Sequence, residues 1–134
     1  MAERQSLEQI SPFFIVSDVP RAIKFYEEQL AFETRILAPE AAPFFAVVGR
    51  DSVQISLKDV SDSSRTIHPQ PNHTRHQWAP WDAFVLVKDP DALAAEFSGR
   101  GVDLHTEILD RDDGLRGFEV RDRDGYVLFF GRPK

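Results

Sequence analysis

The sequence predicts an α+β fold built from two successive βαβββ units. A short apolar segment, an aspartate and an amphipathic helix follow one another at residues 12–30, and the same order returns at residues 83–100. After each helix, short segments rich in apolar residues are separated by turn residues, which is typical of β-strands joined by hairpins. Repetition of a strand, a helix and further strands indicates that one structural unit is used twice.

The first unit opens with a predicted strand at residues 12–16 and a helix at residues 19–30. Apolar residues recur at the spacing of one helix face, at Val19, Ala22, Ile23, Tyr26 and Leu30. Asp18 stands where an N-cap residue is expected, and Pro20 lies in the first turn, where a missing N–H costs no hydrogen bond. The spacing predicts that the apolar face, Tyr26 included, packs in the core.

Three strands complete the first unit. They are predicted at residues 32–37, 44–48 and 52–57. The segment Gly49-Arg50-Asp51 predicts a hairpin between the last two. In the last strand, apolar residues alternate with Gln54 and Ser56, so these two polar side chains are expected to share one face.

The second unit repeats the order with clear boundary signals. Residues 83–87 predict a strand, Asp89 is the expected cap of a helix from Pro90 to Arg100, and Gly99 or Gly101 ends that helix. Three strands are predicted at residues 103–109, 115–121 and 126–130. Turn signals separate them at residues 112–114 and at residues 124–125, the latter an Asp-Gly pair typical of a two-residue hairpin.

The connector between the units, residues 59–81, has no periodic pattern. It contains His68, His73 and His76, with Trp78 and Trp81 close behind them. One interpretation is a loop that folds over a cavity and offers titratable or aromatic contacts. The other is a solvated linker with incidental histidines, since no zinc-motif spacing is present.

Composition narrows the class of protein. A chain of 134 residues without cysteine corresponds to one domain without disulfides or thiolate metal sites. The net charge of −6 argues against nucleic-acid binding, which requires a basic surface. There is neither a membrane-spanning apolar run nor a signal-peptide pattern, so no membrane association and a cytoplasmic location are expected.

Two motifs carry a resemblance to a known family. The segment Val16-Ser17-Asp18-Val19 with Phe25-Tyr26, and residues 114–125 with the sequence GLRGFEVRDRDG, resemble the vicinal oxygen chelate superfamily. That superfamily includes glyoxalase I, extradiol dioxygenases and bleomycin-resistance proteins, and the likeness is to the bleomycin-resistance-like branch. The resemblance covers residues 8–132.

The resemblance implies a single domain spanning residues 1–134. Module one would cover about residues 8–58 and module two about residues 82–132, with residues 59–81 as the connector. Together the modules would form a cupped mixed sheet with the helices on its convex face. The cup would enclose a cavity, and a homodimer is expected to complete it.

The family's metal ligands do not carry over to this chain. The first-strand ligand positions correspond to Ser11 and Asp82, and the last-strand positions correspond to Gln54 or Ser56 and to Phe129. A divalent cation needs several lone-pair donors, and a phenyl ring offers none. No metal cofactor is therefore expected. The alternative is one divalent metal ion held by a shifted set: Asp82, Gln54, Glu119 and a connector histidine.

Strand alternation predicts what occupies the cavity side in place of a metal. Phe13, Ile15, Phe84, Leu86, Val127 and Phe129 share that side, and Phe14, Val16, Val85, Val87, Leu128 and Phe130 lie opposite, under the helices. Because both sides are apolar, both faces of the sheet are expected to be covered. The cavity side would be either plain core or the lining of a pocket for a flat apolar ligand, and an aromatic box can also hold a cation.

Further polar residues could contact a ligand. Arg116 matches a position that is often basic in bleomycin-resistance-like proteins, although a surface arginine balanced by Asp112 and Asp113 is an equal interpretation. Arg116 and Glu119 are predicted on opposite faces of their strand, and His105 is expected to be structural. The ligand-binding set is Phe13, Ile15, Gln54, Ser56, Asp82, Phe84, Leu86, Arg116, Phe129 and Trp78.

These observations favour a protein that binds a small organic molecule without a metal, as antibiotic-sequestering resistance proteins do, with no catalytic residue assigned. One alternative is a metal-dependent lyase, isomerase or dioxygenase of the same fold. Another is an interaction module whose inner face is only core.

Overall fold

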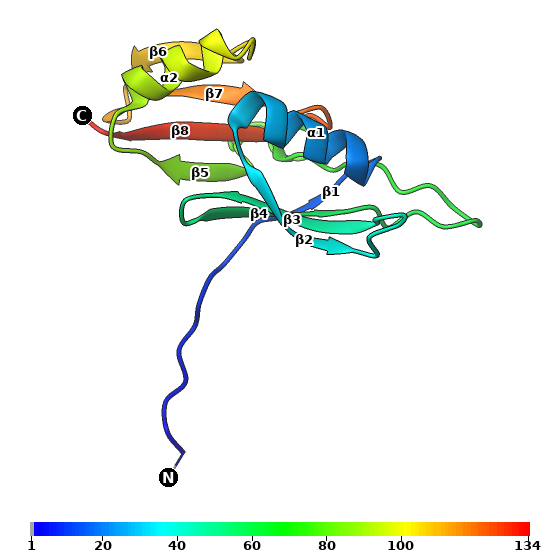
Figure 1. Ribbon diagram of the computed structural model, residues 1–134. Helices are drawn as coiled ribbons and strands as arrows, with labels where there is room; N and C mark the ends of the chain where they lie inside the picture. Colours follow the sequence, from blue (N-terminus) through cyan, green and yellow to red (C-terminus); the bar gives the residue numbers. More distant parts are fainter. Residues whose placement is uncertain (1) are drawn as a thin grey trace.

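The computed structural model describes residues 2–134 as two βαβββ modules (Figure 1). The elements follow in the order β1 (Phe13–Ile15), α1 (Val19–Leu30), β2 (Glu33–Ala38), β3 (Phe45–Arg50), β4 (Val53–Lys58), a 3₁₀ turn (Asn72–Thr74), β5 (Ala83–Leu86), α2 (Pro90–Gly99), β6 (Thr106–Asp110), β7 (Leu115–Arg121) and β8 (Val127–Pro133). The predicted α+β fold with a duplicated unit is confirmed.

Each module contains one four-stranded mixed sheet with the same topology. Sheet one has the order β1-β4-β3-β2 and sheet two has the order β5-β8-β7-β6. The first and last strands of each module pair in parallel, and the other pairs are antiparallel. Helix α1 contacts β2, β3 and β4, and α2 contacts β6, β7 and β8, so each helix covers its own sheet.

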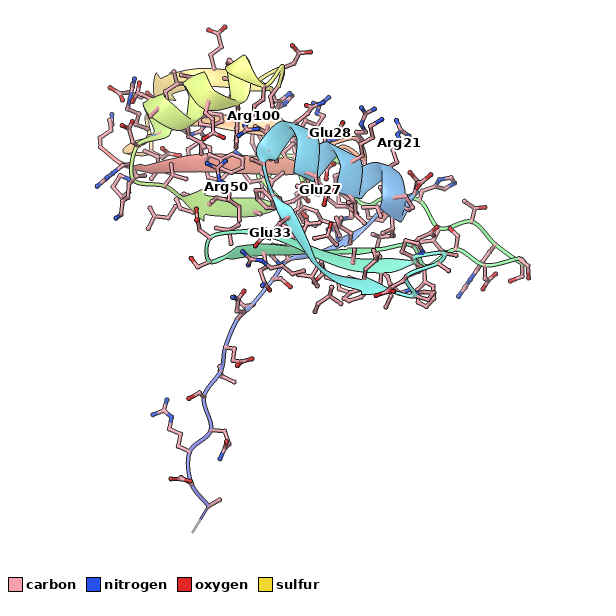
Figure 2. The ribbon with its side chains drawn as sticks, viewed as in Figure 1. Arg21, Glu27, Glu28, Glu33, Arg50 and Arg100 are labelled. Carbon is pink, nitrogen blue, oxygen red and sulfur yellow. The ribbon has the colours of Figure 1, made fainter. Side chains whose placement is uncertain are left out.

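Both helices begin and face the core as their sequences predict. The Asp18 carboxylate accepts the backbone N–H of Arg21, and the Asp89 carboxylate accepts that of Ala92. Tyr26 and Leu30 of α1 are fully buried. Figure 2 shows the charged side chains of the same helix, such as Arg21 and Glu28, on its outer surface.

Several predicted boundaries are wrong by a few residues. The hairpin expected at residues 49–51 turns instead at Asp51 and Ser52, because Asp51 adopts φ = 54° and lets β3 continue to Arg50. The strand expected from residue 103 begins at Thr106, and the last strand runs on to Pro133. The added length of β8 lets it pair with β7 over seven positions, Val127 to Pro133 against Arg121 to Leu115.

The helix-facing sides of the two sheets meet in one continuous core. It contains Phe14, Val16, Val85, Leu128 and Phe130, all buried as predicted. Contacts between the modules add to it: the Phe14 ring stacks on Tyr126 with centroids 4.2 Å apart, and the Tyr26 hydroxyl donates to Asp122 at 2.7 Å. The two modules therefore fold as one cooperative body.

The opposite side of each sheet, which we call its open face, is only partly covered. Phe13 on β1 is 58% exposed, and Phe84 and Leu86 on β5 are 48% and 67% exposed. The expectation that both faces are covered is therefore wrong for the single chain at these edge strands. The predicted cavity is also not enclosed at these positions, because Phe13, Phe84 and Leu86 remain accessible to solvent within one chain.

The segment before β1 extends away from the body of the molecule (Figure 1). Leu7 and Ile10 in this segment are 99% and 93% exposed. Within residues 2–134, neither helix is long and apolar enough to cross a membrane.

Candidate functional site

The open face of sheet two presents a flat aromatic stack built on two glycines. Gly117 of β7 pairs with Gly131 of β8, and neither has a side chain that could fill the space above the sheet. The Phe129 ring lies there, so close that a Cβ on Gly131 would lie 2.5 Å from its Cε1 atom. Phe129, which the family resemblance assigns to a metal-ligand position, is buried as an aromatic floor.

Trp81, the last residue of the connector, covers this floor. Its ring stacks on Phe129 with centroids 4.0 Å apart and planes inclined by 15°. Phe84 lies beside both rings, with centroids 6.1 Å from Trp81 and 5.6 Å from Phe129. Phe84 is half exposed and Trp81 is partly exposed, so these two rings form an apolar surface that a flat molecule can contact, with Phe129 buried beneath them.

One carboxylate is buried beside the aromatic stack. Glu119 of β7 is the register partner of Phe129 and is 7% exposed. Its Oε2 accepts the indole N–H of Trp81 at 2.5 Å, and its Oε1 lies 3.9 Å from Nε2 of His105. Glu119 thus fixes the orientation of Trp81 and places a negative charge on the open face.

The open face of sheet one is more polar. Phe13 pairs in register with Ser56, which also pairs with Val47 on β3. The hydroxyls of Ser11 and Ser56 share a hydrogen bond of 2.8 Å, and Gln54 lies two residues along β4 on the same side. Four predicted ligand contacts therefore share this face of sheet one, which does not include the aromatic stack of module two: Phe13, Ile15, Gln54 and Ser56.

The residues that the family resemblance places at metal-ligand positions do not fit a divalent ion. Both carboxylate oxygens of Asp82 are used inside the fold: Oδ1 accepts the Asn72 N–H at 2.7 Å and Oδ2 accepts the Val127 N–H at 2.8 Å. Ser11 and Ser56 bond to each other, and Phe129 lies under Trp81. Asp82, a predicted ligand contact, instead anchors the connector to β8.

The shifted ligand set does not converge either. Asp82 and Glu119 have the separate partners described above, and the Nε2 of His73 lies 3.0 Å from the carbonyl oxygen of Gly125. Across residues 2–134, no three His, Asp or Glu side chains gather as a metal shell would require.

Two predicted ligand contacts lie away from the aromatic stack. Arg116 is on the helix-facing side of β7, where its guanidinium pairs with Asp91 at 2.6 Å and with Asp110 at 3.0 Å. These hydrogen bonds to two carboxylates raise its pKa and lower that of Asp91. Trp78 is 87% exposed, and it is Trp81 that stacks on Phe129. Arg116 and Glu119 do lie on opposite faces of β7, as expected.

Sequence reasoning missed Trp81 as a site residue. The connector has no period, so nothing in it distinguishes Trp81 from Trp78. Its position directly before Asp82 is the available signal, because Asp82 is where the chain rejoins module two.

His105 contacts Glu119 and Arg121, the latter with its Nη2 3.2 Å from the imidazole Nε2.

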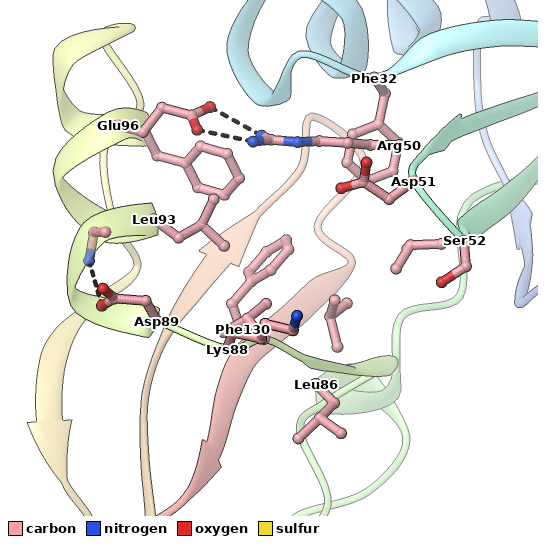
Figure 3. A pocket seen from close by; sticks show the side chains of 15 residues that line it. Phe32, Arg50, Asp51, Ser52, Leu86, Lys88, Asp89, Leu93, Glu96 and Phe130 are labelled. Carbon is pink, nitrogen blue, oxygen red and sulfur yellow. Dashed lines mark hydrogen bonds and ion pairs between the residues drawn. The ribbon is translucent and has the colours of Figure 1, made fainter.

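A separate cavity of about 610 Å³ lies at the seam between the modules (Figure 3). Apolar side chains line it from both modules, and the guanidinium of Arg50 crosses it to bind the Glu96 carboxylate with distances of 2.9 and 2.8 Å. Of the ligand contacts predicted from the sequence, Leu86 alone borders this cavity. Because Arg50 and Glu96 already bond to each other, we interpret this cavity as a gap left where the two modules pack together.

Comparisons with known proteins agree with this fold. The family model described as the Glyoxalase/Bleomycin resistance protein/Dioxygenase superfamily matches residues 7–130. The chain belongs to this superfamily. A search of curated protein sequences gave no match.

Solved structures with the same fold include three that are informative. TioX from Micromonospora sp. ML1 is 20% identical, with 94% of this chain and 98% of that chain covered and a TM-score of 0.70. The bleomycin-binding protein of Streptomyces verticillus, solved with copper(II)-bleomycin, is 23% identical, with 98% and 100% covered and a TM-score of 0.67. TnmS3, an antibiotic binding protein from Streptomyces sp. CB03234, is 19% identical, with 98% and 100% covered and a TM-score of 0.64. At these identities the likeness establishes the fold.

Proposed function

We propose that this superfamily member binds and sequesters a small, flat organic molecule without a metal ion. The observation that carries the proposal is the Trp81–Phe129 stack with Phe84 beside it, at the position where a metal-dependent relative needs a ligand. An accessible aromatic surface of this kind stabilises flat molecules through ring stacking and apolar burial. The named antibiotic-binding proteins of the same fold support this choice of function.

The proposal includes a homodimer that closes the site. Phe13, Phe84 and Leu86 leave apolar surface exposed on both open faces, and a second copy would cover it. The extended segment that carries Leu7 and Ile10 offers a further apolar contact for the partner. A small ligand between two such faces would be shielded from water on both of its sides.

The test uses 2-naphthamide, a neutral bicyclic probe, titrated into the protein in the presence of EDTA. We expect saturable binding, read by tryptophan fluorescence and by an increase in Tm. We expect Phe84→Ala to weaken binding about tenfold because one wall of the site is lost. Phe44→Ala is the matched control, since Phe44 is 50% exposed, close to the 48% of Phe84, but lies before β3 in module one.

Two results would overturn the proposal. One is an absence of binding by 2-naphthamide and by charged molecules of the same outline, together with an unchanged Tm. The other is binding that requires added Zn²⁺, Mn²⁺ or Fe²⁺, which would favour the metal-dependent enzyme of the same fold.

A further inference from the structure

We propose that the aromatic stack of module two selects a flat cation, specifically an amidinium or guanidinium group joined to an aromatic ring. This inference rests on the proposed function and names the class of ligand that the site prefers. Two charged side chains, Arg111 and Glu119, flank the stack.

The chain places one of its own guanidinium groups against the stack. The Cζ atom of Arg111 lies 4.8 Å from the Trp81 ring centroid and 5.5 Å from the Phe129 centroid. Both distances are within the range of about 6 Å at which a cation is attracted by an aromatic ring. Arg111 follows β6 directly, so it reaches the stack from the β6–β7 hairpin. A planar cation is therefore already accommodated at this surface.

The arginine is not fixed there by strong contacts. Its backbone N–H is held by Leu115 at 2.7 Å, but the side chain makes one ion pair, to Asp113 at 3.1 Å within the same hairpin. The two side chains are 34% and 44% exposed, and ion pairs with this exposure contribute little to stability. A ligand cation that displaces the Arg111 guanidinium would replace its ring contacts, and the ion pair that is lost contributes little.

Glu119 supplies the complementary negative charge. Its side chain is 9% exposed, and one of its oxygens is engaged by Trp81. No group in the part of the chain described by the structure donates a hydrogen bond to Oε1, and the nearest basic nitrogen is that of His105 at 3.9 Å. A carboxylate removed from water gains most from a partner that brings both charge and N–H donors.

An amidinium joined to an aromatic ring combines both features. Its aromatic ring can lie against the exposed rings of the stack, and its N–H groups can donate to a carboxylate. A neutral amide ligand has the same shape, but it carries no charge and has fewer N–H donors. A carboxylate ligand would place a second negative charge beside Glu119. The site should therefore rank three molecules of the same outline by their charge.

The test compares 2-naphthamidine, 2-naphthamide and 2-naphthoate by fluorescence titration at low ionic strength. We expect the cationic amidine to bind about tenfold more tightly than the neutral amide, and the anionic naphthoate to bind most weakly. In Glu119→Gln, the preference for the amidine over the amide should disappear. Glu28→Gln is the control, because Glu28 lies on the outer surface of α1 (Figure 2) and should keep the preference.

A second variant tests the site without touching the buried carboxylate. Arg111→Met keeps an unbranched side chain over the rings and removes the competing cation. We expect it to tighten amidine binding three- to tenfold and to leave amide binding within about twofold. If Glu119→Gln does not fold, as judged by its thermal unfolding, this variant carries the test.

The outcomes separate the two proposals. If the amide binds as tightly as the amidine in the wild-type protein, the cation preference is wrong and the proposed function stands. An Arg111→Met variant that binds the amidine more weakly would also contradict the cation site. If none of the three molecules binds, the proposed function itself fails.

Discussion

Asp122 is an acidic residue that is buried where the two modules meet. It lies in the turn before β8 and is 6% exposed. Its carboxylate accepts hydrogen bonds from the Tyr26 hydroxyl of module one and from the backbone N–H groups of Asp124 and Tyr126. Burial raises the pKa of Asp122 to about 6, although these hydrogen bonds oppose the shift. The carboxylate thus joins the modules at a cost in desolvation.

This contact predicts a specific dependence of stability on pH. Because the folded-state pKa lies above the ordinary value of about 3.9, the native state binds this proton more tightly than the unfolded chain does. The proton on Asp122 contributes its full stabilisation below about pH 4, and this contribution is lost as the pH rises through about 6. The free energy of unfolding should fall by about 3 kcal/mol over this range.

Asp122→Asn should remove this dependence. An asparagine can keep the backbone contacts without carrying a charge, so the variant should match the wild type near pH 4 and exceed it in stability at pH 7.5. Urea unfolding at both pH values measures the difference. Asp112→Asn, at an exposed position, controls for the general effect of removing one charge. A wild-type advantage that grows with pH would contradict the argument.

At the scale of elements, the close pairing of β7 and β8 creates the aromatic floor. Gly117 and Gly131 face each other across the ladder, and the Phe129 ring uses the space above them. A Cβ on Gly117 would lie 2.5 Å from the Phe129 ring and 2.8 Å from the Cα of Gly131, and it would also contact the Phe130 carbonyl oxygen. The Phe129 ring therefore fits on the sheet because the two glycines beneath it have no side chains.

Gly117→Ala should consequently destabilise the fold and disturb the site together. The overpacked methyl group should lower the free energy of unfolding by about 1–3 kcal/mol and shift the emission of Trp81 as the stack is displaced. Urea unfolding followed by tryptophan fluorescence reports both effects. Gly99→Ala is the control, since a Cβ there meets nothing within 4 Å and Gly99 lies in the last turn of α2. Equal stability of the two variants would rule out this account of the floor.

At the scale of the whole molecule, the two modules share one core and leave their open faces outward. This arrangement buries the apolar core under the helices, whereas Phe13, Phe84 and Leu86 remain in contact with water. The apolar residues of the extended N-terminal segment are exposed as well. A dimer would remove this surface from water, which is a favourable contribution of about 25 cal/mol per Å² before the cost of association.

The dimer can be tested through the N-terminal segment. The double variant Leu7→Glu/Ile10→Glu should fold normally, because both side chains are more than nine-tenths exposed, and should weaken dimerisation at least tenfold. Analytical ultracentrifugation across a concentration series measures this change. Gln5→Glu/Gln9→Glu adds the same charge to the same segment without removing an apolar side chain, and should remain dimeric. A wild-type protein that is monomeric at tens of micromolar would refute the dimer.

The sequence predicted the secondary structure well where local chemistry decides it. Helix α1 and strand β7 have the predicted bounds. An Asp cap and an apolar face define the helix, and alternating residues between two turns define the strand. The seam between the modules was not predictable in this way. Arg50 and Glu96 form their pair 46 positions apart, and no local pattern relates them.

The candidate site was predicted in part for the same reason. Phe84 and Phe129 were assigned to one face correctly because residues of a strand alternate between its two sides. Trp81 was missed and Trp78 chosen, because the path of an aperiodic connector depends on distant anchors such as Asp82. Alternation placed Arg116 and Glu119 on opposite faces, but it did not give the partners of Arg116, since Asp91 comes from the start of α2.

The sequence by itself therefore determined the duplicated βαβββ order, the buried faces of the helices and the place of Phe129 on the strand face that it shares with Phe84. These features depend on neighbours a few residues away, whose spacing can be read along the chain. Only the tertiary structure decided that Trp81 covers that ring, that Glu119 lies beside it and that the open faces meet water. Those outcomes depend on which distant segments touch, and packing of the whole chain selects the contacts.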